Sequence, residues 1–457
     1  MQRWSIVGCA ALAAFSFATS VAAAPGARVS RTELAAMRDA AVGETVLLAS
    51  APLDATRVGG VRLKRIDVYA RGARVLVAER GGLREVPRSD WLHFIADPND
   101  AEAPLLALSF APDGSAGSGV IMTPDGSFVV DIAAGDGLEL GVGRSTDRAP
   151  DGSALTTSCG TDSAAATDAL GFPIAQAQPA RTVAAPDGAP ATRAAVIAVD
   201  TDNELLNLKF ANNTTNATNY IAALFTQMNL IYERDVDLVL QVGTTILRPS
   251  TTPDPFTNTD FPASQAQLVE FGNWWQANQA GTPRVLAMML SGKATSNNQS
   301  AGIAWVLTSG VYCSQRNGTG GGYSFSQVFK FAQQTAPQDT QVVAHELGHN
   351  FGVAHTHCTG AAGNFPTGTG TLDQCFTGES GLGCFAGPQV CPGVASARTL
   401  MSYCHLTSPG GVACGAVTLA FHPVQITTLL GRIATNVPTC ITPVAPGEAP
   451  LFANGFE

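Results

Sequence analysis

Short segments that alternate apolar and polar residues follow one another between residues 28 and 168. Such alternation places successive side chains on opposite faces of a β-strand, so that one face packs on a core while the other meets water. Clear examples are the segments 61–66, 74–78 and 127–131. Asp113-Gly114 and Asp125-Gly126 separate neighbouring segments, and Asp-Gly is a strong hairpin signal. The pattern therefore predicts a β-rich domain over residues 25–174.

The pattern of apolar positions changes after residue 193. Continuous apolar segments at 194–199, 236–242 and 284–290 are typical of buried strands. Between successive strands lie two segments with helical spacing, 220–232 and 268–279. On the first of them one face carries only apolar residues, which we interpret as a core-packing stripe: Ile221, Leu224, Phe225, Met228 and Ile231. Residues 193–444 are therefore predicted to form an α/β (α+β) domain.

Segments of different composition flank the two predicted domains. Residues 175–192 are rich in Ala, Pro, Gln and Gly, which predicts an exposed linker with a processing site. Residues 1–24 combine Arg3, an apolar run and Ala22-Ala23-Ala24, the pattern of a cleaved signal peptide. We therefore expect a secreted, extracellular protein, with the periplasm as the alternative. Residues 445–457 have no periodicity and are interpreted as a C-terminal tail.

Cysteine usage agrees with export. Eight of the nine cysteines that follow the predicted signal peptide lie from Cys313 onward, an even number suited to disulfides in an oxidising compartment. Their spacing leaves about 105 pairings open. The ninth, Cys159, lies in the β-rich domain shortly before the linker.

Composition and charge narrow the classes of function. The chain has 457 residues and a net charge of −10, and such acidity argues against a nucleic-acid partner, which requires a basic face. No segment after the signal peptide is apolar enough to span a membrane. Histidine occurs only seven times, and six of these residues lie from His345 onward. This clustering directs attention to one segment.

That segment reads His345-Glu346-Leu347-Gly348-His349, on a predicted helix over 341–350 that Asp339 or Thr340 can cap. Histidines four apart project from the same helical face and can share one metal ion. Glu346 can reach a metal-bound water without binding the metal itself. Gly352 suits a left-handed turn that brings His355 back as a third ligand. Three histidines at this spacing would arise by chance in about one such chain in a thousand.

With this motif, His-Glu-x-x-His-x-x-Gly-x-x-His, the chain resembles the metzincin zinc metalloproteases, and among them the reprolysin (adamalysin) group. The resemblance covers most of 193–440 and includes Thr399-Leu400-Met401-Ser402-Tyr403, similar to the family's Met-turn. It implies a mixed, twisted sheet with a long zinc-binding helix, and Met401 as a hydrophobic floor under the metal. It also implies an edge strand near 302–306 to which a substrate can add, and a Cys313–Cys440 bridge.

Several residues near the motif remain open. Tyr403 matches a tyrosine that astacins and serralysins carry near the metal, so it is a candidate oxyanion partner or fifth ligand, with simple packing as the alternative. Reprolysins carry Asp directly after the third histidine, whereas this chain has Thr356. His357 has the wrong spacing for a ligand, and we interpret His405 and His422 as structural or cleft-wall residues.

The chemistry implied by these residues is peptide hydrolysis. Three histidines leave a zinc position open for water, as a catalytic rather than a structural site requires. Zinc lowers the pKa of that water, and Glu346 accepts its proton and returns it to the leaving amine. The prediction is thus a monomeric zinc metalloendopeptidase that acts on proteins or peptides, with one catalytic zinc. No motif supports an additional calcium ion, which stays open.

Two questions remain open beside this prediction: the role of Cys159 and a function without catalysis. Cys159 is a candidate cysteine switch, since a thiolate that binds the zinc would displace the catalytic water and keep a precursor latent. Otherwise Cys159 is free or paired with one of the later cysteines. The competing function is a non-catalytic extracellular binding module with a structural zinc, although such a site has no need of a general base like Glu346.

Overall fold

The computed structural model describes residues 26–97, 104–123, 126–144, 156–159, 191–293, 299–307, 312–313, 320–329, 337–358, 371–379, 384–391, 399–405, 414 and 418–444. The predicted signal peptide, most of the linker, the C-terminal tail and the region 406–412 after the Met-turn lie outside these residues. Within them, no helix is long and apolar enough to cross a membrane.

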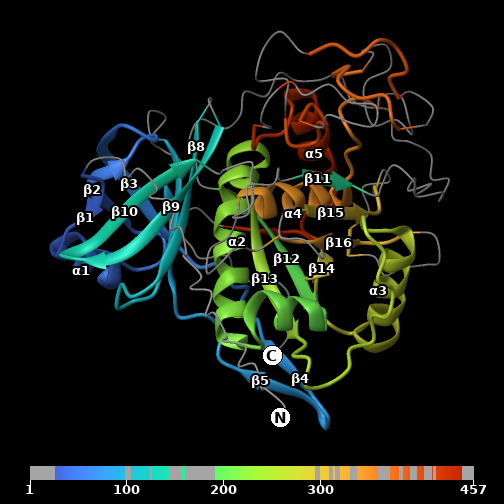
Figure 1. The fold of residues 1–457 in the computed structure, drawn as a ribbon, viewed down its shortest axis with the longest axis horizontal. Coiled ribbons are helices and arrows are strands. Elements are labelled where there is room, and N and C mark those ends of the chain that lie inside the picture. Colours follow the sequence, from blue (N-terminus) through green and yellow to red (C-terminus); the bar gives the residue numbers. More distant parts are fainter. Residues whose placement is uncertain are drawn as a thin grey trace, which may run out of the picture.

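The N-terminal region forms a closed β-barrel, seen on the left of Figure 1. Its strands follow the order β1-β10-β9-β8-β7-β6-β3-β2. Their bounds are β1 Arg28–Val29, β2 Thr45–Pro52, β3 Val58–Ile66, β6 Leu92–Ala96, β7 Leu105–Phe110, β8 Gly117–Thr123, β9 Gly126–Gly135 and β10 Gly137–Arg144. Helix α1 (Arg31–Asp39) starts with a capping box between Ser30 and Glu33 and buries Leu34 and Met37. The predicted β-rich region is confirmed.

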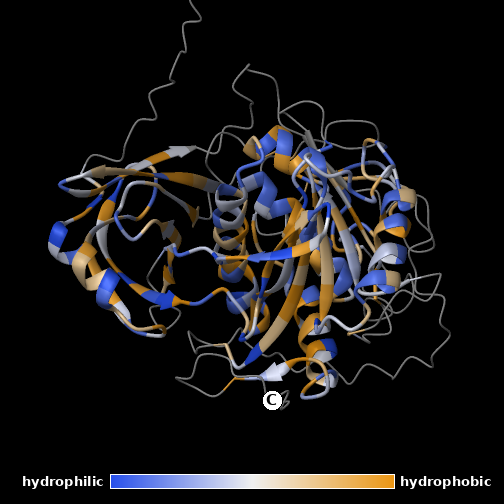
Figure 2. Cartoon of the chain, turned by 90° about the horizontal axis from the view of Figure 1, so that it is seen from below, coloured by the Kyte–Doolittle hydropathy of each residue, from blue (hydrophilic) through white to orange (hydrophobic). Residues whose placement is uncertain are grey.

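The second body of the protein is a mixed sheet covered by helices. Its strand order is β11-β15-β16-β14-β12-β13-β4-β5, with β17 beside β12. The strands other than β4 and β5 are β11 Thr156–Cys159, β12 Arg193–Thr201, β13 Leu238–Leu247, β14 Leu286–Ser291, β15 Gln299–Ala304, β16 Tyr323–Gln327 and β17 Thr442–Pro443. β12, β13, β14 and β16 run parallel, and β15 is antiparallel to β16. The central strands are largely hydrophobic, as parallel strands between layers must be (Figure 2).

The helices of this body are α2 Thr214–Val236, α3 Gln265–Asn278, α4 Pro337–Asn350 and α5 Pro423–Thr435, with a short π-helical turn, η2, at Leu205–Lys209. α4 packs against β15, β16 and α2. The Tyr232 hydroxyl of α2 donates to the Ala344 carbonyl of α4 at 2.8 Å, and Thr340 donates to the side-chain oxygen of Gln227 at 2.7 Å. These bonds fix α4 on the sheet.

The start of α4 differs from the sequence-based prediction. The helix begins at Pro337, so Asp339 and Thr340 lie inside its first turn, and neither is the expected cap. Asp339 is buried and accepts hydrogen bonds from the backbone N–H of Phe329 at 2.7 Å and from the Tyr220 hydroxyl at 2.8 Å. The Asp339 carboxylate therefore makes tertiary contacts and does not cap the helix.

Helix α2 is buried on nearly all sides. The predicted apolar stripe packs in the core, as expected, but most of the other residues of the helix are buried as well. The reason is that the barrel strands β6, β7 and β8 pack on its outer face, so that α2 lies between the barrel and the second sheet (Figure 1). A polar contact also crosses this interface, where Lys64 of β3 pairs with Glu233 of α2 at 3.4 Å.

The N-terminal region also contributes strands to the second sheet. β4 (Val75–Glu79) and β5 (Gly82–Val86) form a hairpin outside the barrel, and β4 pairs in parallel with β13, Val75 opposite Thr245. At the other edge, β11 pairs in parallel with β15. The two halves of the chain are therefore joined by strand pairing at both edges of one sheet.

His93 of β6 lies buried at the interface between the barrel and α2. Its Nδ1 is 3.0 Å from the hydroxyl oxygens of both Ser109 and Thr226, and Thr226 donates its own proton to the Ala222 carbonyl. Nδ1 therefore carries the ring proton, while Nε2 is buried and has no hydrogen-bond partner among the described residues. Protonation would bury an N–H without an acceptor. Burial, with a smaller contribution from Arg65, lowers the pKa of His93 to about 3.

This environment predicts acid sensitivity of the folded precursor. In the unfolded chain a histidine titrates near about pH 6.5, so between about pH 6.5 and 3 the unfolded state binds a proton that the folded state does not. Stability therefore falls as the pH falls through this window. We expect His93→Asn, which keeps a donor at the Nδ1 position but cannot ionise, to lose about 2–3 kcal/mol less stability than the parent between pH 7 and 4.5. Denaturant unfolding at both pH values measures this difference, and equal losses in the two proteins would contradict it.

Candidate metal centre

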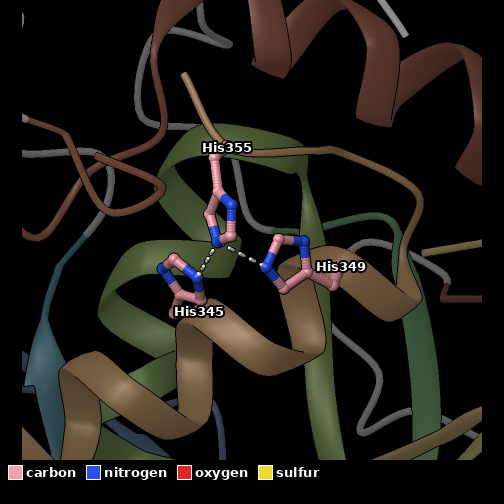
Figure 3. Close-up of side chains that lie close together, drawn as sticks. All are labelled: His345, His349 and His355. Carbon is pink, nitrogen blue, oxygen red and sulfur yellow. Dashed lines mark hydrogen bonds between the residues drawn. The ribbon is translucent and has the colours of Figure 1, made fainter. Parts of the chain in front are cut away.

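Three buried histidines converge above α4 (Figure 3). His345 and His349 lie one turn apart on the helix, which ends at Asn350, and Gly352 follows in the turn after it. The φ of Gly352 is +105°, and a Cβ there would collide with Arg432 and the Leu307 carbonyl, so only glycine fits. The resulting turn brings His355 back over the helix. Its Nε2 lies 3.2 Å from Nε2 of His345 and 3.1 Å from Nε2 of His349.

The other ring nitrogens establish the protonation of the cluster. Nδ1 of His345 donates to the Leu400 carbonyl at 2.8 Å, and Nδ1 of His349 donates to the Val353 carbonyl at 2.7 Å. Nδ1 of His355 donates to a carboxylate oxygen of Glu379 at 2.8 Å. With each Nδ1 protonated, a neutral ring has only a lone pair at Nε2. Three lone pairs that face one another cannot form hydrogen bonds together, so their centre suits a cation.

Burial keeps these rings in the form that binds metal. Burial first, and then His349 and His355, lower the pKa of His345 well below its usual range. Burial, with His355, lowers the pKa of His349 to about 3. The spacing also fits zinc: bonds of about 2.0–2.1 Å in tetrahedral directions would place ligand nitrogens about 3.3 Å apart. The described residues thus provide the three-histidine set that the sequence predicts.

Glu346 lies between α4 and the strand β15. It is fully buried, and a Cβ added at Gly302 of β15 would overlap its carboxylate. The absence of a side chain at Gly302 is therefore what makes room for the predicted general base. β11 pairs with the same strand, and its Cys159 lies in register with Gly302.

The Met-turn holds both the helix and the returning loop. Met401 is fully buried, and its Sδ would lie 2.9 Å from a Cβ at Gly348, which places it under α4 between the two helical ligands. The neighbouring Leu400 carbonyl is the acceptor for His345, and the Met401 carbonyl accepts the backbone N–H of Thr356 at 3.0 Å. Met401 thus packs against α4 at Gly348, and its role as a floor under the metal stays a prediction.

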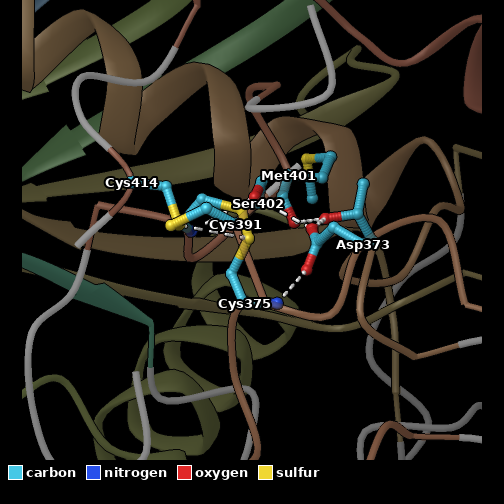
Figure 4. Close-up of a disulfide and its surroundings, with 8 residues drawn as sticks. Asp373, Cys375, Cys391, Met401, Ser402 and Cys414 are labelled. Carbon is cyan, nitrogen blue, oxygen red and sulfur yellow. Dashed lines mark hydrogen bonds between the residues drawn. A yellow bond between two sulfur atoms is a disulfide. The ribbon is translucent and has the colours of Figure 1, made fainter. Parts of the chain in front are cut away.

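A buried aspartate, Asp373, stabilises the loop after His355. In this loop Thr356 occupies the position at which reprolysins carry Asp. Both the Thr356 hydroxyl and the Ser402 hydroxyl donate to Oδ2 of Asp373, the latter at 2.9 Å (Figure 4). The other oxygen of Asp373 accepts the backbone N–H of Cys375 at 3.1 Å. A carboxylate from a later segment therefore ties the third-ligand loop to the Met-turn. No motif in the sequence marked Asp373.

The remaining candidates fall into separate roles. The Tyr403 ring lies 4.4 Å from the His355 ring and 6.1 Å from the His345 ring, so it belongs to the wall of the centre. His357 directs Nε2 toward Glu379, at 2.8 Å, and away from the three-histidine centre. His405 lies beside Tyr403, and His422 caps α5 by accepting the Val424 N–H at 3.2 Å.

Sequence reasoning missed Glu379. Burial opposes its ionisation, but His355 and His357 outweigh burial and hold its pKa well below the usual range.

The eight later cysteines form four disulfides: Cys313–Cys440, Cys358–Cys384, Cys375–Cys404 and Cys391–Cys414. The bridge implied by the family resemblance, Cys313–Cys440, is confirmed. Since all eight pair with one another, Cys159 has no disulfide partner among them. The Cys375–Cys404 and Cys391–Cys414 bridges lie side by side near the Met-turn, with a sulfur of one 4.0 Å from a sulfur of the other.

Comparison with known families assigns this arrangement. Residues 191–411 match the reprolysin model of metallopeptidase family M12. This part of the chain belongs to metallopeptidase family M12. A comparison with curated proteins found none similar in sequence. Among solved structures, the chain is similar to metalloproteinase-II from Bacteroides fragilis, with 12% identity over 68% of this chain and 81% of that chain and a TM-score of 0.31.

For this M12 domain, the contact between β15 and Glu346 predicts a strict requirement at Gly302. Gly302→Ala should push the Glu346 carboxylate away while leaving the three histidines in place. We expect the kcat for peptide hydrolysis to fall about 10²-fold or more, within the range that general-base catalysis contributes, while the zinc content is unchanged.

Gly431→Ala is the matched control, because a Cβ there meets nothing within 4 Å. A Gly302→Ala protein with kcat within about twofold of the parent would show that Glu346 does not need this position.

Proposed function

We propose that this protein is a secreted zinc metalloendopeptidase that is made as a latent precursor. The observation that carries the proposal is the convergence of three Nε2 lone pairs, with Glu346 following the first ligand directly on α4. His345, His349 and His355 would hold the ion, with their Nδ1 protons occupied by Leu400, Val353 and Glu379. Export is supported by the apolar N-terminal segment and by four disulfides, which form in oxidising compartments.

Catalysis then divides between the ion and the chain. A bound zinc ion supplies a lowered pKa for a water molecule and polarises the scissile carbonyl. Glu346 takes a proton from the attacking water on its carboxylate and passes it to the departing amine. Tyr403, whose ring adjoins His355, is placed in our proposal as a partner for the developing oxyanion or as a further ligand.

Substrate binding is assigned to the strand β15. In the full chain this strand is paired with β11, but without β11 it would be the edge of the sheet. An extended peptide can add to such an edge through main-chain hydrogen bonds. Because Gly302 of β15 adjoins Glu346, a peptide on this edge would pass the general base.

Latency follows from the same strand. β11 occupies the edge that a substrate would need, and its Cys159 pairs in register with Gly302 of β15. In this proposal Cys159 supplies a thiolate that binds the zinc. Residues 25–174 would accordingly be a propeptide, cleaved from the M12 domain within 175–192. After such a cut the β4–β5 hairpin would still pair with β13, so release of the propeptide requires that strand to separate as well.

The role of Glu346 gives a first test. Glu346→Gln keeps the size of the side chain but removes the base, so we expect hydrolysis of a generic protein substrate to fall about 10²–10⁴-fold. Zinc should stay at one ion per chain, because the ligands are untouched. His349→Ala, as control, should lose both zinc and activity. If the mature, zinc-loaded parent protein cleaved nothing in a broad peptide library, the non-catalytic binding module would be the correct function.

The role of Cys159 gives a second test, on the uncleaved precursor. Cys159→Ala should raise its activity roughly tenfold or more, because a thiolate is a strong zinc ligand that competes with water. Ser158→Ala, the neighbouring residue of β11, is the control and should leave the precursor latent. A Cys159→Ala precursor as inactive as the parent would mean that latency does not depend on this thiol.

A further inference from the structure

We propose that Glu379 is a positioning residue for the third metal ligand, and that His357 holds Glu379 in place. The inference rests on the proposed zinc function and adds two residues to it. Neither is part of the zinc motif, and Glu379 lies in a segment well beyond it. Together with His355 they form a chain of hydrogen bonds that ends at Nδ1 of His355, across the ring from the ligand nitrogen Nε2.

A single oxygen of Glu379 joins the two rings. Oε2 accepts the Nδ1–H of His355 at 2.8 Å and the Nε2–H of His357 at 2.8 Å. The two imidazoles stack almost in parallel, with centroids 5.2 Å apart and planes 9° apart. Both histidine side chains are inaccessible to solvent, and that of Glu379 is only 16% exposed. The carboxylate therefore cannot rotate without giving up both bonds.

His355 depends on this carboxylate more than the helical ligands depend on their partners. His345 and His349 are carried by α4, and their Nδ1 atoms donate to backbone carbonyls, which no substitution removes. His355 lies on the loop after Gly352, and the acceptor for its Nδ1 is a side chain. The carboxylate also adds negative charge behind the ring, which makes Nε2 a better donor to a cation.

His357 acts on the carboxylate and not on the metal. Its Nε2 donates to Glu379, and its buried Nδ1 has no hydrogen-bond partner among the described residues. The ring is enclosed by aromatic neighbours, with Phe376 at 5.0 Å and Tyr403 at 5.1 Å. Packing therefore fixes the position of His357 as a donor to Glu379.

A disulfide holds the segment that carries Glu379 beside the segment that carries His355 and His357. Cys358, directly after His357, is bonded to Cys384, and the Phe385 N–H donates to the His357 carbonyl at 2.8 Å. This cross-link holds the segment of Glu379 beside the third-ligand loop. The carboxylate is thus supplied by local tertiary structure, although it is distant from the motif in sequence.

The test measures zinc affinity and ligand geometry on mature protein stripped of metal. Zinc binding is followed by competition with a chromophoric chelator, and the cobalt-substituted protein is examined by visible absorption. Glu379→Ala should weaken zinc binding about 10–100-fold, the usual effect of losing such a partner, and should change the cobalt spectrum. Glu379→Gln, which keeps an acceptor but not the charge, should lie between Glu379→Ala and the parent. Glu270→Ala, which removes a carboxylate of α3 that bonds Thr257, is the control.

His357 separates positioning from general structural support. His357→Phe keeps a buried ring but removes the donor, so zinc binding should weaken as in the Glu379→Gln protein. His357→Gln restores an N–H near the Nε2 position and should recover most of the affinity. In the weakened variants, kcat measured at saturating zinc should fall while KM stays close to the parent value.

The outcomes separate this inference from the function on which it rests. Parent protein that binds no zinc would overturn the proposed function. Parent protein with one zinc, and Glu379→Ala with the same affinity and cobalt spectrum, would overturn the positioning role alone. Two zinc ions per parent chain would also overturn it, since His357 and Glu379 would then serve a second ion.

Discussion

The arrangement of the metal centre depends on one electrostatic constraint: three ring nitrogens without protons face one another at 3.1–3.2 Å in a buried site. Left alone, three converging lone pairs repel. They are stable together when each ring is held by its other nitrogen and when a cation takes the centre. Much of the surrounding structure supplies those outer contacts. The Met-turn offers the Leu400 carbonyl, the helix end offers the Val353 carbonyl, and a disulfide-linked segment offers Glu379.

Buried carboxylates also support α4 and the loop that carries His355. Asp339 anchors the helix start to α2 and to the end of β16, and Asp373 ties Thr356 to Ser402 of the Met-turn. Burial costs each carboxylate its hydration, but several hydrogen-bond donors compensate for that loss. A buried charge is tolerated under this condition. Rigid support of this kind holds metal ligands close to the geometry that catalysis needs.

The sequence reveals the parts of the site that depend on local geometry. His345, Glu346 and His349 follow from the helical repeat, and His355 from the turn at Gly352, because these relations span a few residues. Alternating strands of the barrel were predictable for the same reason. Asp373 and Glu379 were not, since loops and disulfides bring them to the site and no fixed spacing marks them. The start of α4 was misplaced because Asp339, which looks like a cap, is used in tertiary contacts. The segment of β4 was recognised as a strand, but its pairing with β13 was not, because strand pairing between distant parts of a chain leaves no local sequence pattern.

Whether His345, His349 and His355 bind zinc through Nε2 is tested most directly by a crystal structure of the zinc-loaded protein. Diffraction is recorded on both sides of the zinc absorption edge. We expect one anomalous peak about 2.0–2.1 Å from Nε2 of His345, His349 and His355, with their Nδ1 atoms still bonded to Leu400, Val353 and Glu379. Zinc bound through an Nδ1 atom, a peak between His357 and Glu379, or no peak at the three-histidine centre in saturated crystals would contradict it.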